Sequence, residues 1–429
     1  MKAFYQVLGN TLIASTTNNY VWFALTFWAY LETKSVIATS FISGMYLLAT
    51  LISGFWFGSI VDHNRKKTAM MISSLASLVA FGLGFGFYLI TPEVLFQTIQ
   101  SYQIWVFSLF LMAGVIAGNV RNITLPTVTT LLVPEKNRDK ANGLSGSVMG
   151  VSFTITSVAS GLVLAYGGMF WVMVSALAFT LLSIIHLLLI SIPEKQIIHL
   201  PNQPKNLDIK GTITVVAAIP GLFALLFFNT FNNFLGGVFM SLMDAYGLTL
   251  VSVQVWGTLW GFLSLGFIIG GLIIAKKGLG KNPLKTMFLA NIAMWVVSIF
   301  FTIQPSIILM AGGMLVWLTL VPFVEASEQT IIQKVVPPER QGRVFGLAQS
   351  IEQAASPLTA FFIGPIAQLI FIPFMTTGAG VDLIGSWFGT GDGRGMALVF
   401  ILAGIIGLVV TLLAMKTKSY KMLSSAYKK

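Results

Sequence analysis

Residues 36–67 read VIATSFISGMYLLATLISGFWFGSIVDHNRKK, and this stretch contains the pattern that decides the fold. A continuous apolar run long enough to cross a membrane, which takes about 20 residues, ends in a short charged sequence from Asp62 to Lys67. A second apolar run follows over residues 68–90. We therefore predict two membrane-spanning helices joined by a short basic loop.

The same pattern extends over the whole chain. Of its 429 residues, 56% are hydrophobic and only 9% are charged, whereas a typical soluble domain is roughly 25% charged. This composition excludes a soluble domain, and it excludes disorder, which requires low hydrophobicity. The apolar runs are continuous and too long for the strands of a membrane β-barrel, which alternate over about ten residues. We predict an all-α membrane protein with twelve spans. They cover approximately residues 7–30, 36–61, 68–90, 104–132, 142–166, 169–192, 211–239, 251–275, 284–303, 307–335, 344–374 and 397–415.

The positive charges predict the orientation of the chain. With the N-terminus inside the cell, 22 of the 25 Lys and Arg residues fall on the cytoplasmic side, leaving only Lys34, Arg121 and Arg394 elsewhere. Cytoplasmic loops of membrane proteins carry this excess of cations. The net charge of +11 therefore indicates topology and contact with anionic membrane lipids, and it does not indicate nucleic-acid binding. We expect a multi-pass protein of the plasma membrane with both termini in the cytoplasm.

Two halves of the chain resemble each other. Residues 133–144 and 336–347 share Val-Pro at the start and Gly-Leu at the end with identical spacing, and each follows an apolar span. Parallel six-helix repeats with a site at their interface are a transporter architecture. We predict an N-terminal six-helix bundle (1–192), a cytoplasmic linker (193–210), a C-terminal six-helix bundle (211–415) and a basic tail (416–429). The glycine-rich residues 375–396 are expected to form a flexible outer connection.

Motifs for enzymatic chemistry are absent from the sequence. There is no cysteine, no G-x-x-x-x-G-K-[ST] phosphate loop and no G-x-S-x-G nucleophile motif. His63, His186 and His199 are isolated and lack metal-ligand spacing. We expect no cofactor, no metal and no enzyme activity, with a membrane enzyme that uses buried carboxylates as a remote alternative.

Four charged side chains lie well inside predicted spans, namely Arg121, Glu325, Glu328 and Glu352. A charge at the membrane centre costs at least roughly 2.5–3.5 kcal/mol on insertion scales, so such residues usually mark ion or substrate pathways. Glu325 and Glu328 are three residues apart and share one helix face, and two carboxylates that close in low dielectric do not both ionise. We predict that one or more of the glutamates couples transport to protons. The alternative is a buried pair that only locks two helices together.

Arg121 needs a partner of its own. A substrate anion and Glu325 are both possible partners for its guanidinium, and the sequence does not choose between them. If Arg121 pairs with Glu325, that carboxylate stays ionised and carries protons poorly. Glu352 and Glu328 lie at similar predicted depths, each about nine residues from the cytoplasmic end of its span, and are then the better proton carriers.

Polar amides among aromatic residues form a second candidate site in spans 1 and 7. A pocket with aromatic walls and few amides suits a large amphipathic molecule better than a sugar, which needs many hydrogen bonds. Asparagine also ties helices together, so helix packing is an equal alternative. The predicted cavity residues are Asn18, Asn19, Trp22, Arg121, Asn229, Asn232 and Asn233.

Glycines spaced four apart predict close helix packing, because small residues let backbones approach. The pattern occurs at Gly54/Gly58, Gly146/Gly150, Gly257/Gly261 and Gly266/Gly270. We expect these helices to slide where the two halves meet.

At this point the chain resembles the major facilitator superfamily. Residues 58–67 are similar to its G-x-L-a-D-r-x-G-r-k loop, with matches at Gly58, Asp62, Lys66 and Lys67 and with His63 and Arg65 replacing the usual Arg and Gly. The resemblance implies that this loop, including Arg65, forms a cytoplasmic gate, with Asp62 closing against the start of helix 11. Residues 336–346 look like the helix 10–11 loop of macrolide-efflux-like drug:proton antiporters, and Arg121 resembles the family's helix-4 arginine. The helix-5 antiporter signature is not present, since Val151 stands where its proline would be.

Together these features predict a secondary transporter that works by alternating access. We expect it to export drug-like hydrophobic or amphipathic compounds in exchange for protons, as a monomer. The alternatives are a lipid or lysolipid translocator and, with less support, a nutrient or metal-ion symporter.

Overall fold

The computed structural model describes residues 2–33, 36–194 and 208–428, which are helical and contain no strand. The chain divides into two compact units. Unit 1 comprises Met1–Ala141, Val148–Thr212 and Val336–Ser350, and unit 2 comprises Asn142–Ser147, Ile213–Val335 and Ile351–Lys429. Most of the predicted linker, residues 195–207, lies outside the described part of the chain.

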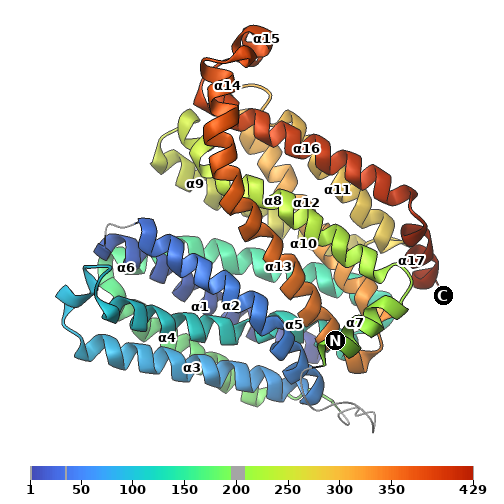
Figure 1. Cartoon of the computed structure of the whole chain (residues 1–429). Helices are drawn as coiled ribbons and strands as arrows, with labels where there is room; N and C mark the ends of the chain where they lie inside the picture. Colours follow the sequence, from blue (N-terminus) through green and yellow to red (C-terminus); the bar gives the residue numbers. More distant parts are fainter. Residues whose placement is uncertain (1, 34–35, 195–207, 429) are drawn as a thin grey trace. The chain divides into compact units, whose positions relative to one another are not determined.

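Unit 1 is built from the first helices of the chain (Figure 1). They are α1 (Lys2–Thr33), α2 (Val36–His63), α3 (Lys66–Ile90), α4 (Tyr102–Gly118), α5 (Val120–Leu132), most of α6 (Arg138–Leu189) and the start of α7 (Ile209–Ala218). Single-turn 3-10 helices at Glu93–Phe96 and Glu135–Asn137 join α3 to α4 and α5 to α6. Helices α4 and α5 meet at Asn119 and together form one candidate span, Tyr102–Leu132.

Helix α6 contains a sharp break that makes it two membrane crossings. Its 52 residues are interrupted at Gly168, where φ is 66° and ψ is −177°. Only glycine adopts this backbone conformation readily, because it has no Cβ to clash. The break falls between the predicted spans 142–166 and 169–192, so the sequence placed this turn correctly.

Unit 2 contains the remaining helices, and within it α11 packs against both α12 and α16 (Figure 1). They are α8 (Leu222–Leu250), α9 (Val253–Leu263), α10 (Leu265–Lys277), α11 (Pro283–Phe300), α12 (Ile307–Val335), α13 (Gln341–Ile366), α14 (Ile372–Thr376), α15 (Ala379–Phe388), α16 (Asp392–Lys416) and α17 (Lys418–Lys428). A 3-10 turn at Pro338–Arg340 precedes α13, whose first residues belong to unit 1, and a π-helix at Ala367–Phe371 links α13 to α14.

These helices account for twelve membrane crossings. In the described part of the chain, nine helical stretches are long and apolar enough to span a membrane, and a bent pair, Phe361–Thr376 with Ala379–Phe388, makes a tenth. One of the nine is the stretch through α6, which supplies two crossings. Helix α1 supplies the twelfth, since its 32 residues extend about 48 Å at 1.5 Å per residue. The predicted all-α fold with twelve spans is confirmed.

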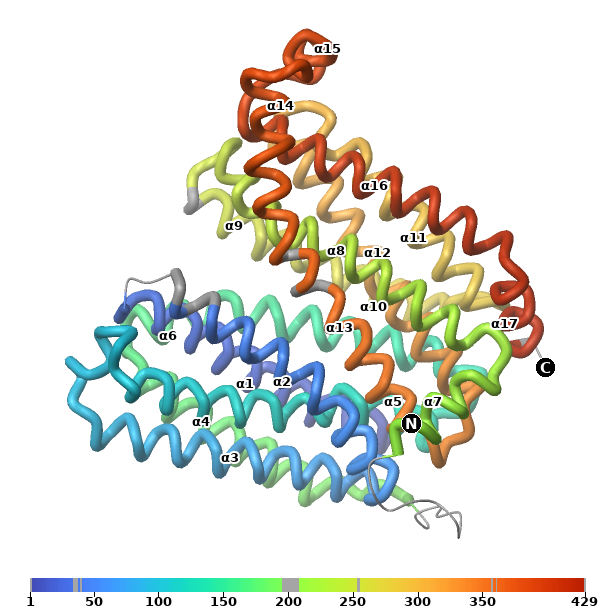
Figure 2. Tube along the Cα trace, viewed as in Figure 1, coloured from blue at the N-terminus to red at the C-terminus, as the bar shows by residue number. Residues whose placement is uncertain are grey.

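The connection after α13 differs from its prediction. Residues 375–396 were expected to be flexible, but they include the helix α15, which bends 74° away from the preceding stretch (Figure 2). Arg394 fastens the start of α16, because it donates hydrogen bonds to the carbonyl oxygens of Thr302 and Ile303, both at 2.9 Å. Its guanidinium also lies 3.8 Å from the ring centroid of Phe388. Glycine content alone misled the prediction, because these tertiary contacts order the segment.

Each unit has an aromatic core of its own. In unit 1, Trp28 is 4% exposed and packs edge-on against Phe96 and Phe107, with ring centroids 5.2 and 5.0 Å apart. In unit 2, Phe239 and Phe400 stack with centroids 5.0 Å apart. Edge-to-face and offset stacks are the favoured aromatic geometries, and packing of this kind supports helix association where lipid removes the hydrophobic drive.

Small residues bring α2 close to the start of α13 within unit 1. A Cβ on Gly58 would lie 2.6 Å from the carbonyl oxygen of Gly342 and 2.9 Å from the Cα of Arg343. Gly54 likewise faces Gly346 and Ser350. Because the neighbouring atoms are mostly backbone, only glycine permits this approach.

In unit 2, glycines at the start of α6 and on α10 pack in the same way. Gly143 and Ser147 lie against Gly271, and Gly270 lies against Thr319 of α12. The prediction fails for Gly257 and Gly261 on α9, because nothing lies within 4 Å of a Cβ built on either residue.

Candidate functional site

The carboxylate of Asp62 binds the first turn of α13. Its Oδ1 accepts a hydrogen bond from the backbone amide of Gly342 at 2.7 Å, and its Oδ2 accepts one from the amide of Arg343 at 2.9 Å. The first amides of a helix have no partner inside the helix, and the helix dipole favours a negative charge there. The glycine contact between α2 and α13 holds the carboxylate at this distance. The motif residues Gly58 and Asp62 thus act on one contact.

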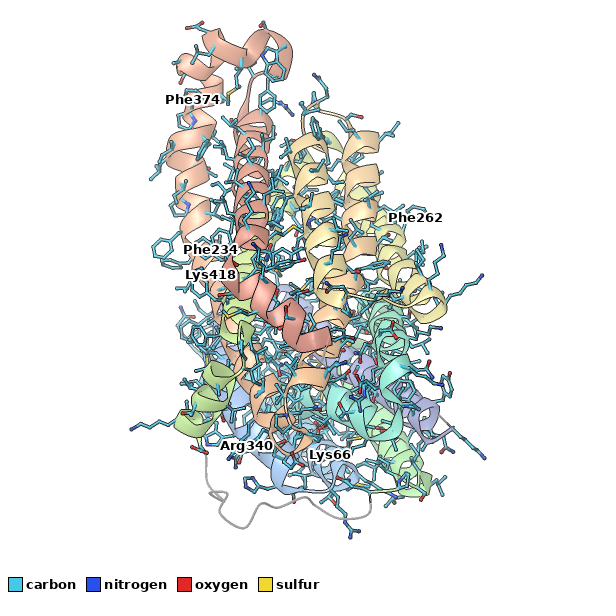
Figure 3. The ribbon with its side chains drawn as sticks, turned by 90° about the vertical axis from the view of Figure 1, so that its right-hand side faces the viewer. Lys66, Phe234, Phe262, Arg340, Phe374 and Lys418 are labelled. Atoms are coloured by element: carbon cyan, nitrogen blue, oxygen red, sulfur yellow. The ribbon has the colours of Figure 1, made fainter. Side chains whose placement is uncertain are left out.

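Arg343 connects this contact to two further groups. Its Nη2 lies 3.1 Å from Nε2 of His63, and its Nη1 lies 3.5 Å from a carboxylate oxygen of Asp208. Asp208 also pairs with Arg340 at 3.3 Å. Figure 3 labels Arg340 and Lys66, which lie at the same end of unit 1. The result is a small charged network around the Asp62 contact.

The other two predicted gate residues serve the loop rather than α13. Lys66 is buried, and its Nζ donates to the carbonyl oxygen of Val61 at 2.7 Å and lies 4.0 Å from Oε1 of Glu194. Its backbone amide donates to Oε2 of the same glutamate at 2.7 Å. Arg65 is exposed and forms the N-cap of α3. Lys66 therefore ties the α2–α3 loop to the segment after α6.

Arg121 lies inside unit 1, where it is 2% exposed. Its guanidinium donates to three neutral side chains from three different helices: Asn10 at 2.7 Å, Ser74 at 2.6 Å and Ser183 at 3.3 Å. These bonds, all within unit 1, fix its orientation. Glu325, the partner considered from the sequence, belongs to unit 2.

Asn18 lines a small cavity beside Arg121. The cavity measures about 10 Å³ and its wall consists mostly of hydroxyl-bearing residues of α1, α3 and α6. Asn19 points elsewhere and donates to Oγ of Ser152 at 3.3 Å. Trp22 packs against Tyr46, with ring centroids 4.2 Å apart. The predicted cavity residues of span 1 are thus divided among three separate contacts.

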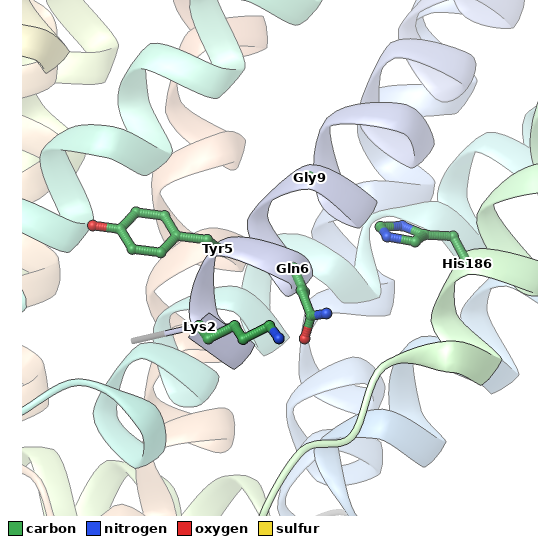
Figure 4. A pocket seen from close by; sticks show the side chains of 5 residues that line it. All are labelled: Lys2, Tyr5, Gln6, Gly9 and His186. Carbon is green, nitrogen blue, oxygen red and sulfur yellow. The ribbon is translucent and has the colours of Figure 1, made fainter.

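A larger groove opens on unit 1 between the start of α1 and the end of α6 (Figure 4). It measures about 630 Å³ and is lined by Lys2, Tyr5, Gln6, Gly9 and His186. In Figure 4, Lys2 and Gln6 lie on the side of α1 that faces His186, and the Tyr5 ring extends to the opposite side. Nδ1 of His186 lies 3.4 Å from Nδ2 of Asn10, so the groove is one residue removed from Arg121.

In unit 2, the structure brings two of the three glutamates together. The carboxyls of Glu328 on α12 and Glu352 on α13 interact with each other and with the amide of Asn229 on α8. One oxygen of each carboxyl and both polar atoms of the amide are buried without a hydrogen bond of good geometry in the described part of the chain. Glu325, one turn before Glu328, is exposed. Buried polar groups in this state are costly unless a proton, water or ligand satisfies them.

The remaining amides of span 7 have different surroundings. Asn232 donates to the carbonyl oxygen of Phe228 at 2.9 Å and accepts from the indole nitrogen of Trp295 at 3.0 Å. It therefore links α8 to α11, as the helix-packing alternative described. Asn233 follows it on α8 and is half-buried.

Sequence reasoning missed several members of these clusters. Asp208 lies in a segment that the sequence marks only as a linker, and Asn10, Ser74 and Ser183 are single polar residues in apolar spans. Single polar residues in several apolar spans can indicate the partners of a buried arginine. They are usable only when it is known which helices face that arginine. In the described residues, no group of three or more His, Cys, Asp or Glu side chains is arranged to hold a metal ion.

Comparison with known proteins agrees with this architecture. The sequence matches the Major Facilitator Superfamily over residues 7–360. It is 26% identical to macrolide efflux protein A of Streptococcus pyogenes over 377 residues, which cover 83% of this chain and 87% of that protein. It is 23% identical to the enterobactin exporter EntS of Shigella flexneri, with 79% and 80% of the two chains covered.

Among solved structures, the chain is similar to a bacterial homologue of the iron transporter ferroportin in an outward-facing state. The TM-score is 0.71 at 13% identity, covering 97% of this chain and all of the other. The chain belongs to the major facilitator superfamily. It is a multi-pass membrane transporter rather than an enzyme.

Proposed function

We propose that the protein exports hydrophobic or amphipathic compounds from the cell in exchange for protons, by alternating access of two six-helix bundles. It acts in the plasma membrane, as a monomer, with both termini in the cytoplasm. The observation that carries the proton-coupling proposal is the buried cluster of Glu328, Glu352 and Asn229. The efflux direction is supported by similarity to proteins named as macrolide and enterobactin exporters.

The chemistry of the cluster favours a proton as the coupling ion. Two carboxyls that close, inside a membrane protein, hold one proton between them more readily than two negative charges. The shared proton also satisfies the buried oxygens that have no other donor. Glu325 is exposed one turn away, and we assign to it the exchange of protons with water. Release of the shared proton leaves two negatively charged carboxylates side by side. This step makes the transport cycle depend on pH.

The amphipathic substrate class is supported by the character of α8. Its aromatic side chains include Phe227 and Phe234, which are exposed, whereas the amides of Asn229 and Asn232 are engaged with other side chains of unit 2. Apolar walls with a few fixed polar groups suit drug-like ligands. A sugar would need many more hydrogen bonds than this helix offers.

The proposal is tested by transport in proteoliposomes with an imposed pH gradient. We expect a fluorescent amphipathic compound to move against its gradient when protons flow the other way. Glu328→Gln and Glu352→Gln should each abolish gradient-driven movement, and Glu325→Gln should slow it. Glu93→Gln is the matched control, because Glu93 lies exposed in the loop before α4.

Two results would overturn the proposal. If a variant with Gln at all three glutamate positions kept full proton coupling, these glutamates would not carry the coupled proton. Movement of a fluorescent phospholipid, with none of the drug-like compound, would replace the substrate class with lipid.

A further inference from the structure

The most unusual buried charge outside the glutamate cluster is Arg121. No carboxylate in the described part of the chain forms an ion pair with it, and its three hydrogen-bond partners are all neutral. Burying an ion is costly unless an opposite charge compensates it. Neutral oxygens satisfy the N–H groups without cancelling the charge.

Arg394 of unit 2 shows how the same fold compensates a second buried arginine. Two of its three hydrogen bonds go to the carbonyl oxygens of Thr302 and Ile303, which follow the C-terminus of α11 at Phe300, and the third goes to the hydroxyl of Tyr246. The C-terminal end of a helix carries partial negative charge, and the ring face of Phe388 adds more. In the described part of the chain, the hydrogen bonds of Arg121 go only to side chains and not to the carbonyl oxygens at the end of a helix, and no aromatic ring forms a cation–π contact with it.

The cavity beside Arg121 supplies space for the missing charge. It holds about 10 Å³, which is close to the minimum needed for one water molecule. A chloride ion is larger than a water molecule, so it fits only when the Asn18 amide and the serine hydroxyls that border the cavity rotate outward. An organic acid or a phosphate is too large even then, so the space suits only a single small ion or a water molecule.

The wall of this cavity presents hydrogen-bond donors to such an occupant. Ser74 and Ser183 accept from Arg121, and in the described residues neither hydroxyl donates to another protein group, so both protons are free. The amide of Asn18 makes no hydrogen bond within the described part of the chain and borders the same space. Ser73 and Ser77 differ, because their hydroxyls donate to backbone carbonyls.

We propose that the cavity formed by Arg121, Asn18, Ser74 and Ser183 binds one small monovalent inorganic anion of the size of chloride. The anion compensates the buried guanidinium and joins α1, α3, α5 and α6 through a common ligand. The groove in Figure 4 is the nearest open space to this cavity, and the buried Asn10 separates the two, because it contacts both His186 and Arg121. The Lys2 ammonium group at this groove attracts anions to it.

The test is anion-dependent stability of the purified full-length protein. Thermal unfolding is measured at constant ionic strength while sodium gluconate is replaced by sodium chloride or bromide. A ligand that binds only the folded state raises the melting temperature saturably. We expect chloride and bromide to do so, whereas gluconate and sulfate should give at most the gradual, non-saturating change that excluded salts produce. Line broadening of the ³⁵Cl resonance by the protein, reversed by bromide, measures the same binding without unfolding.

Variants assign the effect to the cavity. Arg121→Gln should remove both the stabilisation and the line broadening. Asn18→Ala keeps the charge and removes one donor, so the chloride Kd should rise at least about tenfold, the lower limit for a lost hydrogen bond to a charged group. Lys277→Gln is the control, because it removes one positive charge at an exposed position.

Three outcomes would overturn the proposal. Equal melting temperatures in chloride and gluconate, with no chloride line broadening, would mean that the cavity holds only water. An anion effect of unchanged size in Arg121→Gln would place binding elsewhere. Loss of the effect in Lys277→Gln to the same degree would reduce it to general charge screening.

Discussion

Asp62 at the end of α2 accepts hydrogen bonds from the backbone amides of both Gly342 and Arg343 in the first turn of α13. Asp62 and Arg343 are 281 positions apart in the chain. The carboxylate is buried and lies 4.0 Å from Nε of Arg343, so charge and hydrogen bonding act together. The family motif supplies the aspartate, and the glycines of both helices supply the distance.

We predict that Asp62→Asn weakens this contact, because the amide offers only one accepting oxygen and no charge. Each hydrogen bond to a charged group contributes about 1.5–3 kcal/mol, so transport should fall at least about tenfold. The measurement is vesicle transport normalised to the amount of folded protein. Asp382→Asn, at an exposed position on α15, should transport normally. Normal transport by Asp62→Asn would show that the contact does not matter for the cycle.

His63 is expected to act as a neutral acceptor for Arg343. Its Nδ1 lies 2.8 Å from the carbonyl oxygen of Ser59, so Nδ1 carries the proton and Nε2 offers its lone pair to Arg343. His63→Gln keeps an accepting oxygen and should retain transport. His63→Arg, which restores the usual family residue, places a second cation beside Arg343 and should reduce it. Equal rates for the two variants would exclude this role.

Gly58→Ala should separate α2 from α13. The added methyl group would lie against backbone atoms of Gly342 and Arg343, which cannot rotate away. Overpacking of this kind costs typically 1–3 kcal/mol, so we expect a lower melting temperature and slower transport. Gly82→Ala is the control, because a Cβ there meets no atom within 4 Å. Similar behaviour of the two variants would contradict the close packing.

Arg394→Ala should destabilise unit 2, because α15 and the start of α16 lose their attachment to the segment after α11. The arginine is 4% exposed, and loss of three hydrogen bonds and a cation–π contact should cost at least about 3 kcal/mol. Thermal unfolding of the purified protein measures this. Arg394→Lys retains charge but cannot reach both carbonyls, and should fall between wild type and alanine. If Arg394→Ala left the melting temperature unchanged, Arg394 would not be ordering this segment, and the expectation of a flexible connection would stand.

The candidate site was predicted in parts. The cost of burying a charge in the membrane singled out Arg121, Glu325, Glu328 and Glu352 from the sequence, and residue counting predicted that Glu352 and Glu328 lie at a similar depth. The sequence could not assign Arg121 its partners, because Asn10, Ser74 and Ser183 are scattered over 173 positions and resemble ordinary polar residues of a span. Asp208 escaped notice for a related reason, since its role depends on Arg340 and Arg343 arriving from far along the chain.

The amino-acid sequence by itself determined the class of protein, the twelve crossings and the charged residues inside them. These three properties depend on local quantities. They are the length of an apolar run, the net charge of a loop and the free-energy cost of placing one ion in lipid. Only the tertiary structure decided which helix faces meet. That choice rests on packing between residues that can be hundreds of positions apart. The absence of a methyl group at Gly58 lets Asp62 reach the first turn of α13, and the carbonyl oxygen of Thr302 gives Arg394 an acceptor.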